Sequence, residues 1–214
     1  MDTRTKEAVR YLGYGRHAID ERTFMLIQES FQELEKIADV KSIYRIFEIS
    51  HLNANELKLG KMTVKSSSLC KNLKGCDLAI LFGVTLGAEI DRRMRKYEIT
   101  DIPKAVVFQA SAAAFLEEHC DEIEEKMKNE FHQLGQYLRP RFSPGYGDFS
   151  ILHQKEILEM LDAPKRIGLT MTDSFMMIPT KSVTAVIGVS KTNENCHKKG
   201  CEICSKTDCL YRRS

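Results

Sequence analysis

Hydrophobic residues recur along this chain with two different periods, and the changes between them mark out helices and strands. Between residues 21 and 38 the apolar side chains lie three or four positions apart with charges between them, and Asp20 precedes them as a candidate helix N-cap. Residues 42–50 place Ile43, Phe47 and Ile49 on one face, which indicates a strand. Residues 77–84 are apolar almost throughout, as is typical of a strand in the middle of a sheet. The pattern therefore predicts a protein of mixed helices and strands.

The longest predicted helix spans about 103–134, with Pro103 in its first turn. Its first half is rich in small residues that allow close packing, and its second half is strongly acidic, which we interpret as a solvated helix face. The same patterns predict shorter helices over 4–13, 66–73, 85–97 and 153–162, and strands over 56–64, 171–179 and 182–189. Residues 1–190 are thus expected to form one α+β domain, followed by a cysteine-rich C-terminal tail over 191–214.

Composition excludes several classes of protein. Hydrophobic residues make up 43% and charged residues 29% of the 214 positions, as in soluble globular proteins. The net charge of +2 provides no strong attraction to nucleic acid or to an anionic membrane. No apolar run approaches the ~18 residues of a membrane-spanning helix, and the first 20 residues contain no apolar signal-peptide core. We expect a cytoplasmic protein with neither nucleic acid nor membrane as its partner.

Four of the seven cysteines are concentrated near the C-terminus. They form the pattern C-x4-C-x2-C-x4-C, at Cys196, Cys201, Cys204 and Cys209. Four thiolates are a full ligand set for zinc or for an iron–sulfur cluster, and the spacing does not decide between them. The alternative is a tail of four unligated thiols. Cys70 and Cys76, in the body of the chain, are expected to be ordinary buried thiols.

The segment R-P-R-F-S-P-G-Y-G at 139–147 is a candidate small-molecule loop. Pro144 and Gly145 favour a tight, constrained turn that would present Tyr146. The planar guanidinium of an arginine suits a ligand carboxylate, and we favour Arg141 over Arg139 because of its spacing to Tyr146. The residues alone equally allow a surface loop that packs on its own aromatic side chains. Dinucleotide-binding, Walker A, zinc-protease and nucleophile-elbow motifs are absent from the sequence.

Three segments carry a resemblance to a known family. They are R-F-S-P-G-Y at 141–146, I-G-L-T-M-T-D-S-F-M-M-I-P at 167–179, and G-C-D-L-A-I-L-F-G-V-T-L-G at 75–87. In this order they resemble the activation (reactivation) domain of cobalamin-dependent methionine synthase in its stand-alone form, over roughly residues 5–190. The resemblance implies a curved, mostly antiparallel sheet with flanking helices over one face, and it places the strands at 77–84, 171–179 and 182–189 in that sheet.

The same resemblance implies a function in methionine biosynthesis. The domain would bind S-adenosylmethionine and support the reductive methylation of inactive cob(II)alamin, with cobalamin held by a separate methionine synthase or other corrinoid protein. Such a protein is an accessory subunit of a methyltransferase and needs an electron donor such as flavodoxin or ferredoxin. By the same resemblance, Arg141 would contact the methionyl carboxylate, Ser143, Gly145 and Tyr146 would line the ligand, and Glu117 would be a further polar contact.

The sequence also departs from the family pattern. The acidic ligand contact near the N-terminus of the fused domain has no clear counterpart in residues 1–50, and the cysteine tail replaces a tyrosine-containing stretch. The cobalamin, folate and homocysteine modules are missing, so we expect a separate activation subunit. The alternative hypothesis is a metal- or iron–sulfur-binding regulatory or scaffold protein that keeps the fold without ligand binding. A free-standing methyltransferase is disfavoured by the missing glycine-rich strand–helix motif.

Overall fold

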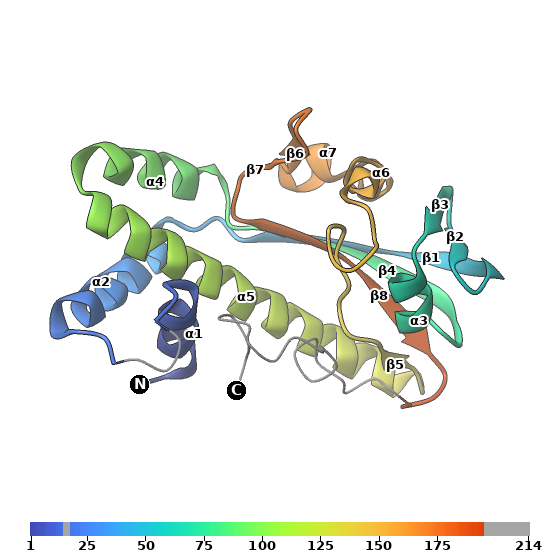
Figure 1. Cartoon of the computed structure of the whole chain (residues 1–214). Helices are drawn as coiled ribbons and strands as arrows, with labels where there is room; N and C mark the ends of the chain where they lie inside the picture. Colours follow the sequence, from blue (N-terminus) through green and yellow to red (C-terminus); the bar gives the residue numbers. More distant parts are fainter. Residues whose placement is uncertain (15–17, 195–214) are drawn as a thin grey trace.

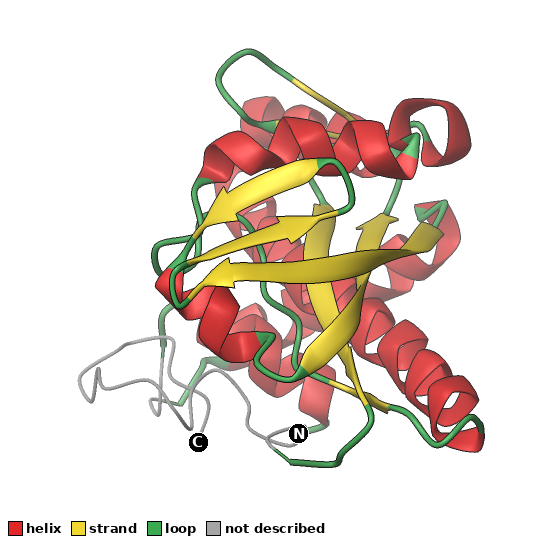
Figure 2. Ribbon diagram, turned by 90° about the vertical axis from the view of Figure 1, so that its right-hand side faces the viewer, coloured by secondary structure: helices red, strands yellow, loops and turns green. Residues whose placement is uncertain are grey.

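The computed structural model describes residues 1–14 and 18–194, in which a six-stranded sheet lies between two layers of helices (Figure 1). The strand order is β3-β2-β1-β4-β8-β5, and each neighbouring pair is antiparallel. Figure 2 shows that the sheet is strongly twisted and curved. The predicted α+β fold with an antiparallel sheet is confirmed. The strands are β1 (Lys41–Asn53), β2 (Glu56–Leu59), β3 (Met62–Lys65), β4 (Cys76–Thr85), β5 (Tyr137–Leu138) and β8 (Ser182–Ser190).

One face of the sheet is covered by helix α5 (Ile102–Gln133), which confirms the single long helix predicted there. Small residues such as Ala112 and Ala114 are buried along α5 and allow it to approach the sheet and its neighbouring helices closely. Ile80 and Phe82 of β4 contribute to the core on this side. Three more helices pack against α5, namely α1 (Thr3–Tyr11), α2 (Glu21–Ile37) and α4 (Ala88–Thr100).

The opposite face carries a second core, so the expectation of helices over one face alone is wrong. Ala79 and Leu81 of β4 point to this side and pack with buried residues of the shorter helices. Because successive residues of a strand point to opposite faces, the unbroken apolar run of β4 is what a strand buried on both sides requires. The elements of this layer are α3 (Ser67–Asn72), the 3-10 helix η1 (Ile151–His153), α6 (Gln154–Leu161) and α7 (Ala163–Ile167).

Two predicted strands are instead hairpins. The stretch over 56–64 turns at Gly60 and forms β2 and β3. The stretch over 171–179 forms β6 (Thr170–Met171) and β7 (Met177–Ile178), a two-stranded sheet outside the main one. Here Thr172 accepts hydrogen bonds from the amides of Phe175 and Met176, and this turn interrupts the strand. No helix within 1–14 or 18–194 is long and apolar enough to cross a membrane.

Candidate functional site

The loop at 139–149 is fastened to the fold near both of its ends. Phe142 exchanges two backbone hydrogen bonds of 2.9 Å with Val186 of β8. The Phe149 side chain is buried and stacks on the Phe142 ring, with 6.3 Å between the ring centroids. Between these points, the Gly145 amide donates to the Phe149 carbonyl oxygen at 2.8 Å. The loop is therefore a closed turn held at two fixed positions.

The tip of this turn presents Tyr146 to solvent. Gly145 has a φ of +92°, a conformation that side-chain-bearing residues rarely adopt. Tyr146 follows with 68% of its surface exposed, whereas Pro144 is buried and Ser143 is half-buried. The exposed ring thus comes from a constrained backbone, as the turn residues predicted.

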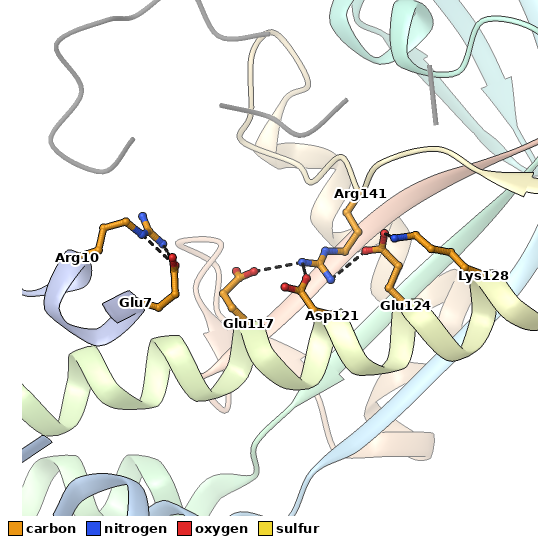
Figure 3. Close-up of polar contacts among 7 residues, drawn as sticks. All are labelled: Glu7, Arg10, Glu117, Asp121, Glu124, Lys128 and Arg141. Carbon is orange, nitrogen blue, oxygen red and sulfur yellow. Dashed lines mark hydrogen bonds and ion pairs between the residues drawn. The ribbon is translucent and has the colours of Figure 1, made fainter. Parts of the chain in front are cut away.

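The Arg141 side chain lies against an acidic face of helix α5 (Figure 3). Its Nη2 is 2.6 Å from Asp121 Oδ1 and 3.2 Å from Glu117 Oε2. Its Nη1 is 3.0 Å from Glu124 Oε2, at ion-pair distance but without the alignment of a hydrogen bond. Glu124 Oε1 lies 3.0 Å from Lys128 Nζ. Because positions three and four apart share one side of a helix, these three carboxylates can face a single guanidinium.

Burial differs among the members of this cluster. The side chains of Arg141 and Glu124 are 16% and 10% exposed, whereas that of Asp121 is 59% exposed. Burial alone would lower the pKa of the Arg141 guanidinium, but the carboxylates, Glu124 foremost, raise it above its usual value. Arg141 is therefore a permanent cation. Burial raises the pKa of the neighbouring Cys120 thiol to about 12, so Cys120 is neutral at physiological pH.

Arg139 is the less suitable of the two arginines for contacting a ligand. Its side chain is directed at the turn after α3, where Nη2 donates to the Lys74 carbonyl oxygen at 3.1 Å. Only 5% of Arg139 is exposed. It also packs on Gly188, where an added Cβ would lie 2.9 Å from Arg139 Cγ. This burial favours Arg141 as the guanidinium that a ligand can reach.

Comparison with known proteins gives these residues a family context. Residues 67–198 match the family described as vitamin B12 dependent methionine synthase, activation domain. The chain belongs to this family. The matched region includes α5, the loop at 139–149 and β8, and hence every contact of Arg141 described above.

The fold of this activation-domain protein is also found in a solved structure. The crystal structure of the MetH reactivation domain bound to AdoHcy has a TM-score of 0.60 and 16% sequence identity to this chain. The likeness covers 91% of this chain and 77% of that one, and at this identity it establishes the fold. No curated protein matches the chain.

The structure brings the predicted site residues of the activation-domain protein into one region. Glu117 and Arg141 are in contact, and Ser143, Gly145 and Tyr146 follow on the anchored turn. Sequence reasoning missed Asp121 and Glu124, and the interpretation of the acidic run as a solvated face is wrong for Glu124, which is buried. The spacing of the carboxylates by four and then three positions was the available signal.

The predicted metal ligands Cys196, Cys201, Cys204 and Cys209 lie outside the described residues. Within the ranges 1–14 and 18–194, no group of three or more histidine, cysteine, aspartate or glutamate side chains could hold a metal ion. Cys70 and Cys76 are buried, as predicted.

Proposed function

We propose that this activation-domain protein binds S-adenosylmethionine between the turn at 141–146 and helix α5. In this proposal it acts in the cytoplasm and supports the reductive methylation of cob(II)alamin on a separate methionine synthase or other corrinoid protein. The observation that carries the proposal is the contact of Arg141 with Glu117 beside the turn that bears Tyr146. Membership of the family supports it, as does the AdoHcy bound to the MetH reactivation domain.

The charges of the site match those of the methionyl end of the ligand. That end carries a carboxylate and an ammonium group next to the sulfonium. The Arg141 fork can bind the carboxylate with two parallel hydrogen bonds, while Glu117 can accept from the ammonium. Asp121, the most exposed partner of Arg141, would give up its place to the ligand carboxylate, and Glu124 would keep its contact with Nη1.

The task of these residues is to hold the ligand in a fixed orientation. When bound, S-adenosylmethionine would supply the methyl group for the partner's cob(II)alamin and leave as S-adenosylhomocysteine, with one electron from a donor such as flavodoxin or ferredoxin. Arg141 and Glu117 would fix the methionyl end, and Ser143, Gly145 and Tyr146 would line the ligand along the turn. Alignment of the sulfonium methyl toward the partner is the contribution that positioning makes to the rate.

Calorimetric titration of the purified protein tests the binding step. S-adenosylmethionine and S-adenosylhomocysteine should each bind at one site per chain, and adenosine, which lacks the methionyl end, should bind far more weakly. No heat at millimolar ligand would reject the proposal and favour a regulatory or scaffold protein that keeps the fold without the ligand. A pull-down from cell extract, assayed for bound cobalamin, tests the partner.

We also propose that Cys196, Cys201, Cys204 and Cys209 bind a metal, as an iron–sulfur cluster or as zinc. Their spacing in the sequence supports this, since four thiolates complete either ligand set. A cluster would also suit the electron that reactivation requires. Anaerobic purification with metal analysis is the test. Iron with visible absorption indicates a cluster, stoichiometric zinc indicates a structural site, and metal-free protein with four titratable thiols rejects both.

A further inference from the structure

The carboxylate of Asp148 joins the end of the candidate ligand loop to the start of helix α3. Asp148 Oδ1 accepts a hydrogen bond from the Ser66 hydroxyl at 2.6 Å and one from the Ser68 amide at 3.0 Å. Asp148 Oδ2 accepts from the Ser67 amide at 2.7 Å. These partners are 80 to 82 positions away in the sequence. The carboxylate of one loop residue thus accepts three hydrogen bonds from an element that is distant in the sequence.

Helix α3 is a fixed support for this contact. Leu69 and Cys70 of α3 are buried in the core on that side of the sheet. The Ser66 hydroxyl accepts from the Leu69 amide at 3.0 Å, and the Ser66 carbonyl oxygen accepts from the Cys70 amide at 3.0 Å. With Asp148 bonded to the amides of Ser67 and Ser68, the amides that a helix start leaves without intrahelical partners are satisfied. The loop therefore supplies hydrogen-bond acceptors to the start of the helix, and the helix in turn fixes the loop carboxylate.

Two further contacts hold the loop to the same helix. The Asn72 side-chain amide, at the end of α3, donates to the Pro140 carbonyl oxygen at 3.4 Å. Gly147, beside Asp148, has a φ of +55°, and an added Cβ would lie 2.8 Å from Ser68 Oγ. The backbone of the loop thus approaches α3 as closely as a residue without a side chain allows.

We propose that Asp148 is a positioning residue, which sets the conformation of the 142–149 turn and so places Tyr146 and Gly145 for ligand binding. The inference rests on the proposed function for its ligand, S-adenosylmethionine. The hydrogen bonds from the Ser66 hydroxyl and the amides of α3 hold the pKa of Asp148 well below its usual range, so the carboxylate is ionised throughout the physiological range. The contact is therefore permanent at working pH.

Replacing Asp148 with Asn tests the contact with a minimal change of shape. The Asn side chain keeps one acceptor oxygen and turns an N–H donor toward donors of α3, so it cannot reproduce all three hydrogen bonds. Asp148→Glu keeps the charge and both acceptors. Gly147→Ala disturbs the same approach from the backbone. Asp77→Asn is the matched control, because it removes one negative charge from an exposed ion pair with Lys191 far from the loop in sequence.

Two measurements are made on the full chain at a temperature where circular dichroism shows every variant folded. We expect Asp148→Asn and Gly147→Ala to raise the Kd for S-adenosylmethionine about 5-fold, comparable to the net contribution of a single hydrogen bond. We expect Asp148→Glu to recover part of this and Asp77→Asn to match wild type. In ligand-free protein, hydrogen exchange at the Gly145 and Phe149 amides should be faster in Asp148→Asn than in wild type, because those amides close the turn.

The outcomes separate this inference from the proposed function. Unchanged exchange at Gly145 and Phe149 in Asp148→Asn would show that Asp148 does not order the turn and would overturn the inference. Faster exchange with unchanged affinity would overturn it as well, because the order of the turn would then not matter to the ligand. If wild type itself binds no S-adenosylmethionine, the proposed function fails, and exchange alone then decides whether Asp148 orders the turn.

Discussion

Replacing Arg141 with Ala is the most direct perturbation of the candidate site. The Arg141 side chain is 16% exposed and its guanidinium already has three carboxylate partners, so a ligand carboxylate must replace one of them. The net contribution of Arg141 to binding is therefore at the lower end for a charge-assisted, largely desolvated contact, about 2 kcal/mol. This corresponds to a roughly 30-fold rise in the Kd for S-adenosylmethionine.

The assay is calorimetric titration of wild type, Arg141→Ala and Arg141→Lys with S-adenosylmethionine. Lys should recover only part of the affinity, because its ammonium cannot form two parallel bonds with a carboxylate. Arg166→Ala is the control, since that side chain is 67% exposed and pairs only with nearby Asp162 among the described residues. Equal affinity of Arg141→Ala and wild type, or full recovery by Lys, would refute the role of the planar fork.

The same geometry predicts an opposite effect at Asp121. This residue is 59% exposed and competes with a ligand carboxylate for Nη2 of Arg141. Asp121→Asn should therefore lower the Kd by about 2- to 5-fold, the worth of an exposed ion pair. A weaker complex in the same titration would mean that Asp121 contacts the ligand itself, and it would rule out competition between Asp121 and the ligand carboxylate.

Three further predictions concern stability and reactivity. The pKa of Asp148 is lower in the folded state than in the unfolded chain, so its stabilising effect is fully present above about pH 4 and is lost as the pH falls. The free energies of unfolding of wild type and Asp148→Asn, measured in urea, should therefore converge toward acid pH. A difference that stays constant with pH would contradict this. Cys120 is fully buried with a raised thiol pKa, so iodoacetamide at pH 8 should label it only after denaturation, as peptide mapping can check. Phe82→Ala should lower the free energy of unfolding by about 3–5 kcal/mol, because the Phe82 side chain of β4 is fully buried in the core between the sheet and the helices on the α5 side. A loss below ~1 kcal/mol in urea titrations would argue against this core.

The local pattern of hydrophobic and polar residues was sufficient to predict most of the helices and strands. The long helix at 102–133 and the central strand at 76–85 were predictable because each depends on periodicity and burial that neighbouring residues share. The constrained turn at Gly145 was predictable for the same reason, since proline and glycine restrict the backbone locally. The hairpin at 170–178 was not predicted, because its turn depends on hydrogen bonds of Thr172 that hydrophobic pattern does not reveal.

The pairing of distant residues was decided by the tertiary structure alone. The sequence predicted that Arg141 would face a carboxylate. Only the packing of the loop on α5 shows that the Arg141 guanidinium already forms ion pairs with Glu124 and Asp121. Likewise, an aspartate after a glycine indicates a turn, and nothing local shows that Asp148 completes the start of a helix 80 positions earlier. Periodicity reports which face of an element is buried, whereas the partner of a charged side chain depends on which elements the fold brings together.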